Sequence, residues 1–156
     1  MFDSWFFILE NMEIKLKFGF DELLFGMKQN HVETLYGKAD FQYKDEEQNV
    51  ILGYNDLKSR LTFYEEEGFR LGYITISNPE AVLFGEKVMG KSREEVLQVL
   101  KANKITQWET EVNDGVTMLF NEENWVFLHF DYGVLVTIEI GAVFTQKDEF
   151  DWKFKA

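Results

Sequence analysis

Cysteine is absent from this chain of 156 residues, and proline occurs once, as Pro79. Without cysteine the protein can form no disulfide bond, use no catalytic thiol and carry no lipid on an N-terminal cysteine. Its two histidines, His31 and His129, do not have the close spacing of zinc or copper ligands. No apolar run approaches the roughly 20 residues of a membrane-spanning helix. We therefore expect a domain stabilised by its apolar core, with no metal and no cofactor.

Basic residues are scarce as well: 16 Lys and Arg stand against 28 Asp and Glu, which gives a net charge of −12. An evenly acidic surface repels phosphate backbones and anionic lipids, so we expect neither nucleic-acid nor membrane binding. The same acidity favours a basic protein as partner, although it also serves solubility. The short apolar run at 5–9 has acidic neighbours and no preceding basic residue, unlike a signal peptide. A cytoplasmic location is therefore expected.

Aromatic residues are abundant, at 17% of the chain, and many follow strand or helix patterns. Residues 5–9 and 12–18 fit an N-terminal β-hairpin. Val32, Leu35 and Tyr36 have the spacing of a short helix that ends at Gly37. Period-two alternation then predicts four strands separated by short polar turns, around 41–43, 50–54, 61–63 and 72–76. Short turns between successive strands predict antiparallel pairing.

The same order of elements follows Pro79. Ser92 and Glu95 have the spacing of a capping box at the start of a second helix, and four more strands are expected around 105–112, 116–120, 125–131 and 134–140. The stretch 24–40 corresponds loosely to 83–104, and a constant offset of 64 residues aligns the two halves. The sequence thus predicts an α+β fold with two tandem repeats of one helix and four antiparallel strands (αββββ twice) after the hairpin. The expected divisions are 1–19 for the hairpin, 20–79 and 80–144 for the repeats, and 145–156 for an aromatic C-terminal tail.

Two patterns could carry chemistry. The segment Gly85–Ser92 fits the GxxxxGK[ST] pattern of phosphate-binding loops, but its interior is bulky and partly acidic, and a helix entrance explains the same residues. His129 and Asp131 lie on one face of an expected strand, where they could orient a base, but no nucleophile accompanies them. We therefore expect no catalytic residue and no enzyme. A nucleotide-binding, ligand-binding or enzymatic domain with a pocket between helix and sheet stays as an alternative.

The predicted strands carry more apolar residues than a sheet with one solvent-exposed face needs. If Trp125 and Phe127 face the helices, as Leu61 and Phe63 are expected to do, large apolar side chains lie on the opposite face. Such a face is either covered by the tail at 150–154, as a strand or a docking arm, or contacts a partner. Aromatic residues suit interface anchors. The expected partner-binding residues are Tyr43, Tyr64, Tyr73, Trp108, Leu128 and Phe130.

The residues around the two helices resemble a known repeat. The first set is Gly26-Met27, Val32, Leu35, Gly37 and Asp40, and the second is Gly90, Ser92, Val96 and Leu100. They resemble the repeat of the β-lactamase inhibitory protein fold and of the outer-membrane assembly lipoproteins of the SmpA/OmlA type. Lys28 stands where those families have Ser or Thr, and Ala39 where they have Pro. The chain also resembles bacterial immunity-type proteins of toxin systems, which are typically cytoplasmic and acidic.

This resemblance implies a protein that binds and blocks one other protein through its sheet surface. The missing cysteine excludes the lipoprotein variant, and the lack of disulfides departs from the secreted inhibitor. We therefore expect an immunity protein that neutralises a bacterial toxin, with a basic toxin domain as the candidate partner. A structural homodimer that uses the aromatic face is the remaining alternative.

Overall fold

The computed structural model describes residues 12–155, which form two α-helices, one 3₁₀ helix and thirteen strands. The helices are α2 (Gln29–Tyr36), α3 (Arg93–Ala102) and the 3₁₀ helix η1 (Glu65–Glu67). The amide of Gly37 closes α2, and Ser92 Oγ accepts a hydrogen bond from the Glu95 amide at the start of α3. Both α-helices therefore lie where the apolar spacing and the capping residues predict them.

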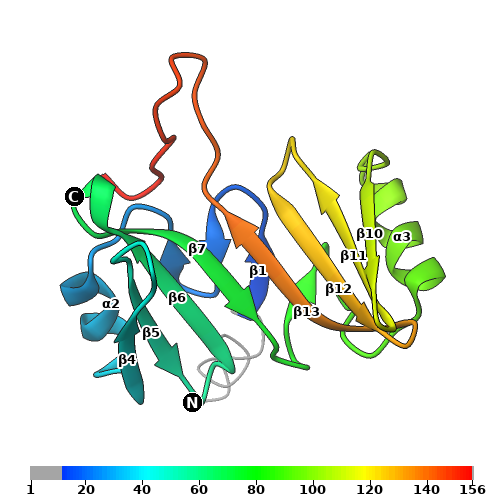
Figure 1. The fold of residues 1–156 in the computed structure, drawn as a ribbon, viewed down its shortest axis with the longest axis horizontal. Helices are drawn as coiled ribbons and strands as arrows, with labels where there is room; N and C mark the ends of the chain where they lie inside the picture. The colour runs from blue at the N-terminus through cyan, green and yellow to red at the C-terminus, as the bar shows by residue number, and fades with distance from the viewer. Residues whose placement is uncertain (1–11, 156) are drawn as a thin grey trace, which may run out of the picture.

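Eight strands form one antiparallel sheet, the large sheet (Figure 1). Its first half consists of β4 (Phe41–Lys44), β5 (Val50–Tyr54), β6 (Ser59–Tyr64) and β7 (Arg70–Ile76). Its second half consists of β10 (Glu109–Asn113), β11 (Val116–Asn121), β12 (Val126–Asp131) and β13 (Val134–Gly141). The order is β10-β11-β12-β13-β7-β6-β5-β4, so the two halves meet where β13 pairs with β7.

Five strands of two or three residues form a second, small sheet in the order β3-β2-β1-β8-β9. They are β1 (Glu13–Lys15), β2 (Gly19–Phe20), β3 (Leu23–Leu24), β8 (Val82–Leu83) and β9 (Glu86–Lys87). β1 and β8 pair in parallel, whereas the other pairs of this sheet are antiparallel. The small sheet thus joins the segment before α2 to the segment before α3.

The antiparallel sheets and the α+β character expected from the sequence are confirmed. The expectation of two tandem αββββ repeats preceded by a hairpin is wrong as a description of the fold. All eight longer strands belong to one sheet, and segments from 13–24 and 82–87 combine into a second sheet that the expectation lacked. The parallel pair β1–β8 joins segments far apart in the sequence, and local periodicity does not reveal such a pair. The strand expected at 5–9 lies outside the described residues.

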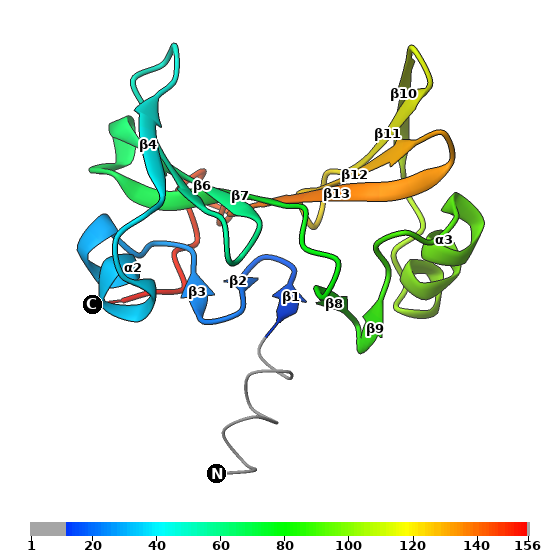
Figure 2. The ribbon, with the colours of Figure 1, turned by 90° about the horizontal axis from the view of Figure 1, so that it is seen from below.

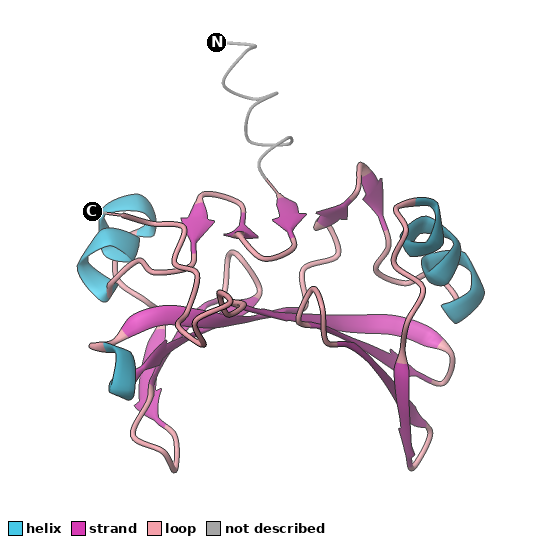
Figure 3. Cartoon of the chain, turned by 90° about the horizontal axis from the view of Figure 1, so that it is seen from above, coloured by secondary structure: helices cyan, strands magenta, loops and turns pink. Residues whose placement is uncertain are grey.

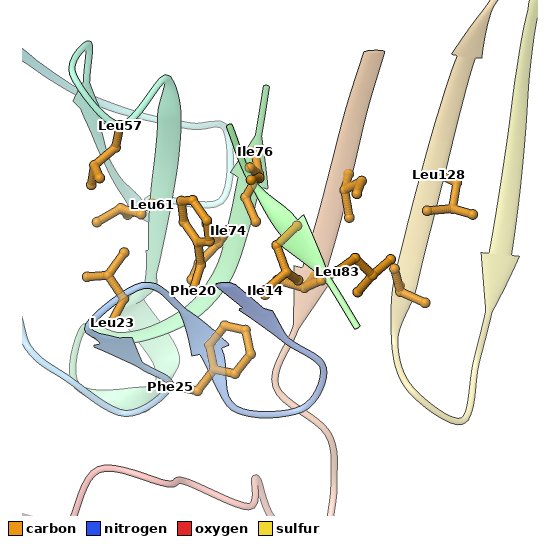
Figure 4. Packing of buried hydrophobic residues seen from close by; sticks show 14 of the residues in the cluster. Ile14, Phe20, Leu23, Phe25, Leu57, Leu61, Ile74, Ile76, Leu83 and Leu128 are labelled. Atoms are coloured by element: carbon orange, nitrogen blue, oxygen red, sulfur yellow. The ribbon is translucent and has the colours of Figure 1, made fainter. Parts of the chain in front are cut away.

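The helices and the small sheet cover one face of the large sheet, which curves away from them (Figures 2 and 3). Phe20 and Leu23 of the small sheet pack toward Leu61 and Ile74 of the large sheet (Figure 4). All four side chains are completely buried. Burying a side chain of this size contributes about 1.5–3 kcal/mol. This layer between the sheets therefore holds the fold together and leaves the other face of the large sheet free.

Residues 143–155, the C-terminal arm, leave β13 as a projecting loop and return to the first half of the sheet (Figure 1). The Phe154 amide donates a hydrogen bond to Phe25 O, and the Phe154 ring lies 4.5 Å from the His31 ring at the start of α2. The arm forms one isolated β-bridge and no strand of a sheet. Of the two forms expected for the tail, the structure shows the docking arm.

Candidate binding face

The face of the large sheet that is turned away from the helices, called the open face, is concave, and no described helix covers it (Figure 2). The strand register places one row of side chains across all eight strands: Phe41, Gly53, Arg60, Thr75, Glu139, Phe127, Phe120 and Glu109. Their neighbours along the strands, such as Leu52, Leu61, Ile138 and Leu128, are completely buried on the core side. Register and burial therefore assign the two faces consistently.

Aromatic rings lie flat on the first half of the open face because glycines stand beside them. The Phe41 ring of β4 covers Gly53 of β5, and the Tyr64 ring of β6 covers Gly72 of β7. A Cβ atom on either glycine would collide with the ring. Glycine in a strand often marks such a close approach. The local sequence thus builds a smooth aromatic surface rather than a row of projecting side chains.

Aromatic residues continue across the second half. The Phe120 ring of β11 stacks on Phe127 of β12 with ring centroids 4.3 Å apart, and the Trp125 ring meets Phe120 edge-on at 5.0 Å. Phe127 in turn lies 6.4 Å from Tyr73 of β7. These distances are typical of favourable aromatic pairs. A connected aromatic surface therefore crosses the junction between the two halves.

A polar cluster lies at the centre of the open face. The Tyr73 hydroxyl donates a 2.5 Å hydrogen bond to Glu139 Oε1, and His129 Nε2 lies 2.5 Å from Glu139 Oε2. That contact lacks hydrogen-bond geometry, so the buried Nε2 atom has no hydrogen-bond partner among the described residues. Burial raises the pKa of Glu139, but the contacts from His129 and Tyr73 outweigh it and hold the pKa below its usual range. Burial and Glu139 raise the pKa of Tyr73 well above its usual value.

Two pockets border the open face at opposite ends. One, of about 490 Å³, lies in the first half and includes Phe41, Lys58 and Arg60. The other, of about 450 Å³, lies at the edge of the second half. Its lining combines two aromatic residues with three glutamates: Trp108, Phe120, Glu109, Glu122 and Glu123. The two ends of the face thus offer opposite charges beside similar aromatic groups.

The structure brings three of the expected partner-binding residues together on the open face. Tyr43 is 42% exposed and lies opposite Ile51 in the same sheet row as Tyr73. Tyr64 borders this row, and its ring also contacts Phe150 of the C-terminal arm. Trp108 precedes β10 and is partly buried beside the acidic pocket. These four residues are therefore placed where a partner could reach them.

Leu128 and Phe130 lie on the core face and are completely buried, so their expected contact with a partner is wrong. The cause is the constant offset of 64 residues. The β6–β7 connection spans residues 65–69, whereas the β12–β13 connection has only residues 132 and 133, so it is three residues shorter. An odd shift exchanges the two faces of a strand. Trp125 and Phe127 consequently belong to the open face instead of facing the helices.

Sequence reasoning missed Phe41, Phe120, Trp125 and Phe127 as residues of the open face. A usable signal was present in the strands themselves, since glycine interrupts β5 and β7 at positions where neighbouring aromatic rings need space. This signal does not give the register across strands, and the register is what brings these residues together.

The two candidate patterns, His129 with Asp131 and the segment Gly85–Ser92, do not have the arrangement that an oriented base or a phosphate-binding loop needs. His129 contacts Glu139 and not Asp131, which is exposed beyond a bulge at the end of β12. Within Gly85–Ser92, residues 86–87 form β9, and the Glu95 amide is occupied by the Ser92 side chain. Among residues 12–155, no group of three or more His, Asp or Glu side chains could hold a metal ion.

No known family model matches the sequence, and no curated protein matches it significantly. A solved structure with a similar fold is the 1.5 Å crystal structure of an extracellular protein containing an SCP domain from Bacillus anthracis str. Ames. The two chains are 14% identical, with a TM-score of 0.51 over 73% of this chain. This chain spans less than half, 42%, of the length of that protein. At this identity the likeness shows a shared fold alone.

The description of that protein as extracellular contradicts the cytoplasmic location expected for this chain. That expectation rested on the absence of cysteine and on the charges around one short apolar run, and neither feature identifies the compartment in which a domain acts. No helix of the described residues is long and apolar enough to cross a membrane.

Proposed function

We propose that this protein binds another protein through the open face and inhibits it, as an immunity protein blocks a toxin. One observation carries the proposal: a connected aromatic surface lies on a concave sheet face that no described helix covers. Aromatic anchors surrounded by polar groups are typical of protein interfaces. The resemblance to immunity-type proteins supports the inhibitory role.

The geometry favours a protein over a small molecule as the ligand. Both pockets beside the open face are open to solvent, whereas small-molecule sites enclose most of their ligand in an apolar cavity. The aromatic surface spans both halves of the sheet, a width that suits a folded partner. The proposal that the protein binds a partner rests on the open face alone and does not depend on the compartment in which the two proteins meet.

Site-specific photo-crosslinking tests the proposal directly. A photoreactive phenylalanine analogue replaces Phe127 on the open face in one variant and the exposed Gln98 on α3 in a control variant. We expect the partner from the native host to crosslink at position 127 and not at 98. Equal crosslinking at both positions, or crosslinking at 98 alone, would place the interface elsewhere.

A substitution then tests whether the crosslinked interface supplies the affinity. Phe127→Arg puts a charge into the stack with Phe120, whereas Gln98→Arg puts the same charge on the outer surface of α3. Loss of an aromatic anchor costs about 2 kcal/mol or more, roughly 30-fold in affinity. We expect that loss, and loss of inhibition of the partner, for Phe127→Arg only. Unchanged inhibition by Phe127→Arg would refute the role of the open face.

A further inference from the structure

The two halves of the open face differ in charge. The segment 105–146, which contains β10 to β13, has seven acidic residues and no Lys or Arg: Glu109, Glu111, Asp114, Glu122, Glu123, Asp131 and Glu139. All except Glu139 are exposed. The corresponding segment of the first half, residues 41–76, also has seven acidic residues, but it has four basic residues beside them, and Arg60 lies on the open face itself. The second half therefore has a negative potential that none of its own residues balances.

The aromatic pocket at the edge of the second half lies within this acidic region. Glu109 of β10 pairs with Phe120 of β11, so a carboxylate stands beside the aromatic ring. Glu122 and Glu123 line the same pocket. None of the ion pairs found in residues 12–155 involves these three glutamates. Aromatic rings attract cations, so rings and carboxylates together suit the side chain of lysine or arginine.

We propose, building on the protein-binding function above, that the second half of the open face takes a lysine- or arginine-rich segment of the partner. One basic side chain of that segment enters the pocket between Trp108 and Phe120, where Glu109 pairs with its charge. The backbone of the segment follows the aromatic surface toward Glu139 at the centre of the face. A second copy of this chain is a poor occupant, because its own net charge is −12.

A peptide titration tests this charge preference with the purified full chain. The probe is a short peptide of alternating lysine and alanine, and the control peptide has glutamate in place of lysine. Amide NMR spectra report the contact site residue by residue. We expect the lysine peptide to shift the amide signals of Glu109, Phe120 and Phe127, and the glutamate peptide to shift none of them. Added salt should weaken binding of the lysine peptide because exposed charges are screened.

Two matched triple variants distinguish binding at a local site from general attraction between the net charges of the protein and the peptide. One variant carries Glu109→Gln, Glu122→Gln and Glu123→Gln. The control carries Glu46→Gln, Glu65→Gln and Glu66→Gln at exposed positions of the first half, in the β4–β5 turn and in η1. Both lose the same charge. We expect about tenfold weaker binding of the lysine peptide by the first variant and less than twofold by the control. Trp108→Ala should weaken binding at unchanged net charge.

Two results would overturn the inference: equal loss of affinity in both triple variants, or lysine-peptide shifts that lie outside the second half of the open face. Either result leaves the proposed function standing, because its own test uses the native partner and no assumption about charge. Conversely, a native partner that crosslinks only at position 98 would refute the proposed function whatever the peptide does.

Discussion

The first and second halves of the large sheet share one core but present different surfaces. The C-terminal arm packs on the first half: its Phe150 ring lies against Tyr64 of β6, and its backbone bonds to Phe25. The described chain gives the second half no comparable cover, and its exposed acidic residues face solvent. The inner face of the large sheet is equally apolar in both halves. The two halves therefore differ in the charges and the cover on their surfaces and not in their apolar core.

Removing the side chain that anchors the C-terminal arm is expected to cause the largest loss of stability, and to affect the first half of the sheet more than the second. Trp152 is partly buried against the core and stacks on Phe150 with ring centroids 4.8 Å apart. We expect Trp152→Ala to lower the free energy of unfolding by about 3 kcal/mol, since lost aromatic packing costs this much in a core. Urea denaturation measures the loss.

Hydrogen exchange on the same variant shows which half depends on the arm. Amides of β6 and β7, next to the arm, should lose protection before those of β11 and β12. Phe144→Ala is the matched control, because Phe144 belongs to the arm but is 55% exposed, and it should cost less than about 1 kcal/mol. Equal loss of protection in both halves would mean that the arm supports the whole sheet.

Two glycines at corresponding places give a finer comparison. Gly26 precedes α2 and bonds to Leu71 O of β7, and Gly90 precedes α3 and bonds to Leu135 O of β13. Both have positive φ, +108° and +85°. A Cβ atom on Gly26 would lie 3.1 Å from both Phe154 O and Trp152 Cβ, whereas one on Gly90 would meet nothing within 4 Å.

Alanine at these positions should therefore cost different amounts. We expect Gly90→Ala to destabilise the fold by about 1 kcal/mol, from backbone strain alone. Gly26→Ala should destabilise the fold by about 2–3 kcal/mol, because the new methyl group both strains the backbone and displaces the C-terminal arm. Thermal unfolding of both variants measures the difference. Equal destabilisation by the two substitutions would mean that the arm moves away from the methyl group at position 26 without a loss of stability.

The sequence predicted the elements of the large sheet better than their assembly. Period-two alternation located β5 and β13, and the capping pair Ser92 and Glu95 located α3, because these signals are local. The strands of the small sheet have two or three residues, too few to show a period. Their partners are set by packing, which the order of residues along the chain does not express.

The sequence places the expected residues of the first half on the correct face of the sheet and reverses the two faces in part of the second half. Tyr43, Tyr64 and Tyr73 lie on the open face. Tyr64 and Tyr73 sit in strands whose buried neighbours are clear from the alternation, whereas all four residues of β4, the strand of Tyr43, are exposed. β12 is apolar on both faces, with Phe127 as large as Leu128 or Phe130, so alternation does not indicate which face is buried. The length of the β12–β13 connection, two residues, then decides the register, and a constant offset of 64 residues does not include this shorter turn. Glu139 could not be linked to Tyr73 or His129, because that contact needs the β7–β13 pairing.

The contacts of Glu139, which link the two halves of the large sheet, are expected to make the smallest contribution to stability. Glu139 of β13 accepts the Tyr73 hydrogen bond from β7 and contacts His129, and its pKa lies below the ordinary value of 4.5. A carboxyl group whose pKa is lower in the folded state stabilises the fold above its unfolded pKa. That stabilisation is lost as the pH falls from about 4.5 through the folded pKa. The contribution should be about 1 kcal/mol at neutral pH.

Glu139→Gln tests this link, with unfolding by urea measured from neutral pH downward. We expect the variant to be less stable than the wild type at pH 7 and the difference to vanish below the folded pKa of Glu139, where both carry a neutral side chain. Tyr73→Phe removes one hydrogen bond and keeps the carboxylate, so the folded pKa of Glu139 should rise toward its ordinary value. The acid-dependent loss of stability should then be smaller and should be complete at a higher pH. A difference that stays constant across this pH range would show that Glu139 acts through packing, and the polar junction between the halves would then be electrostatically neutral to folding.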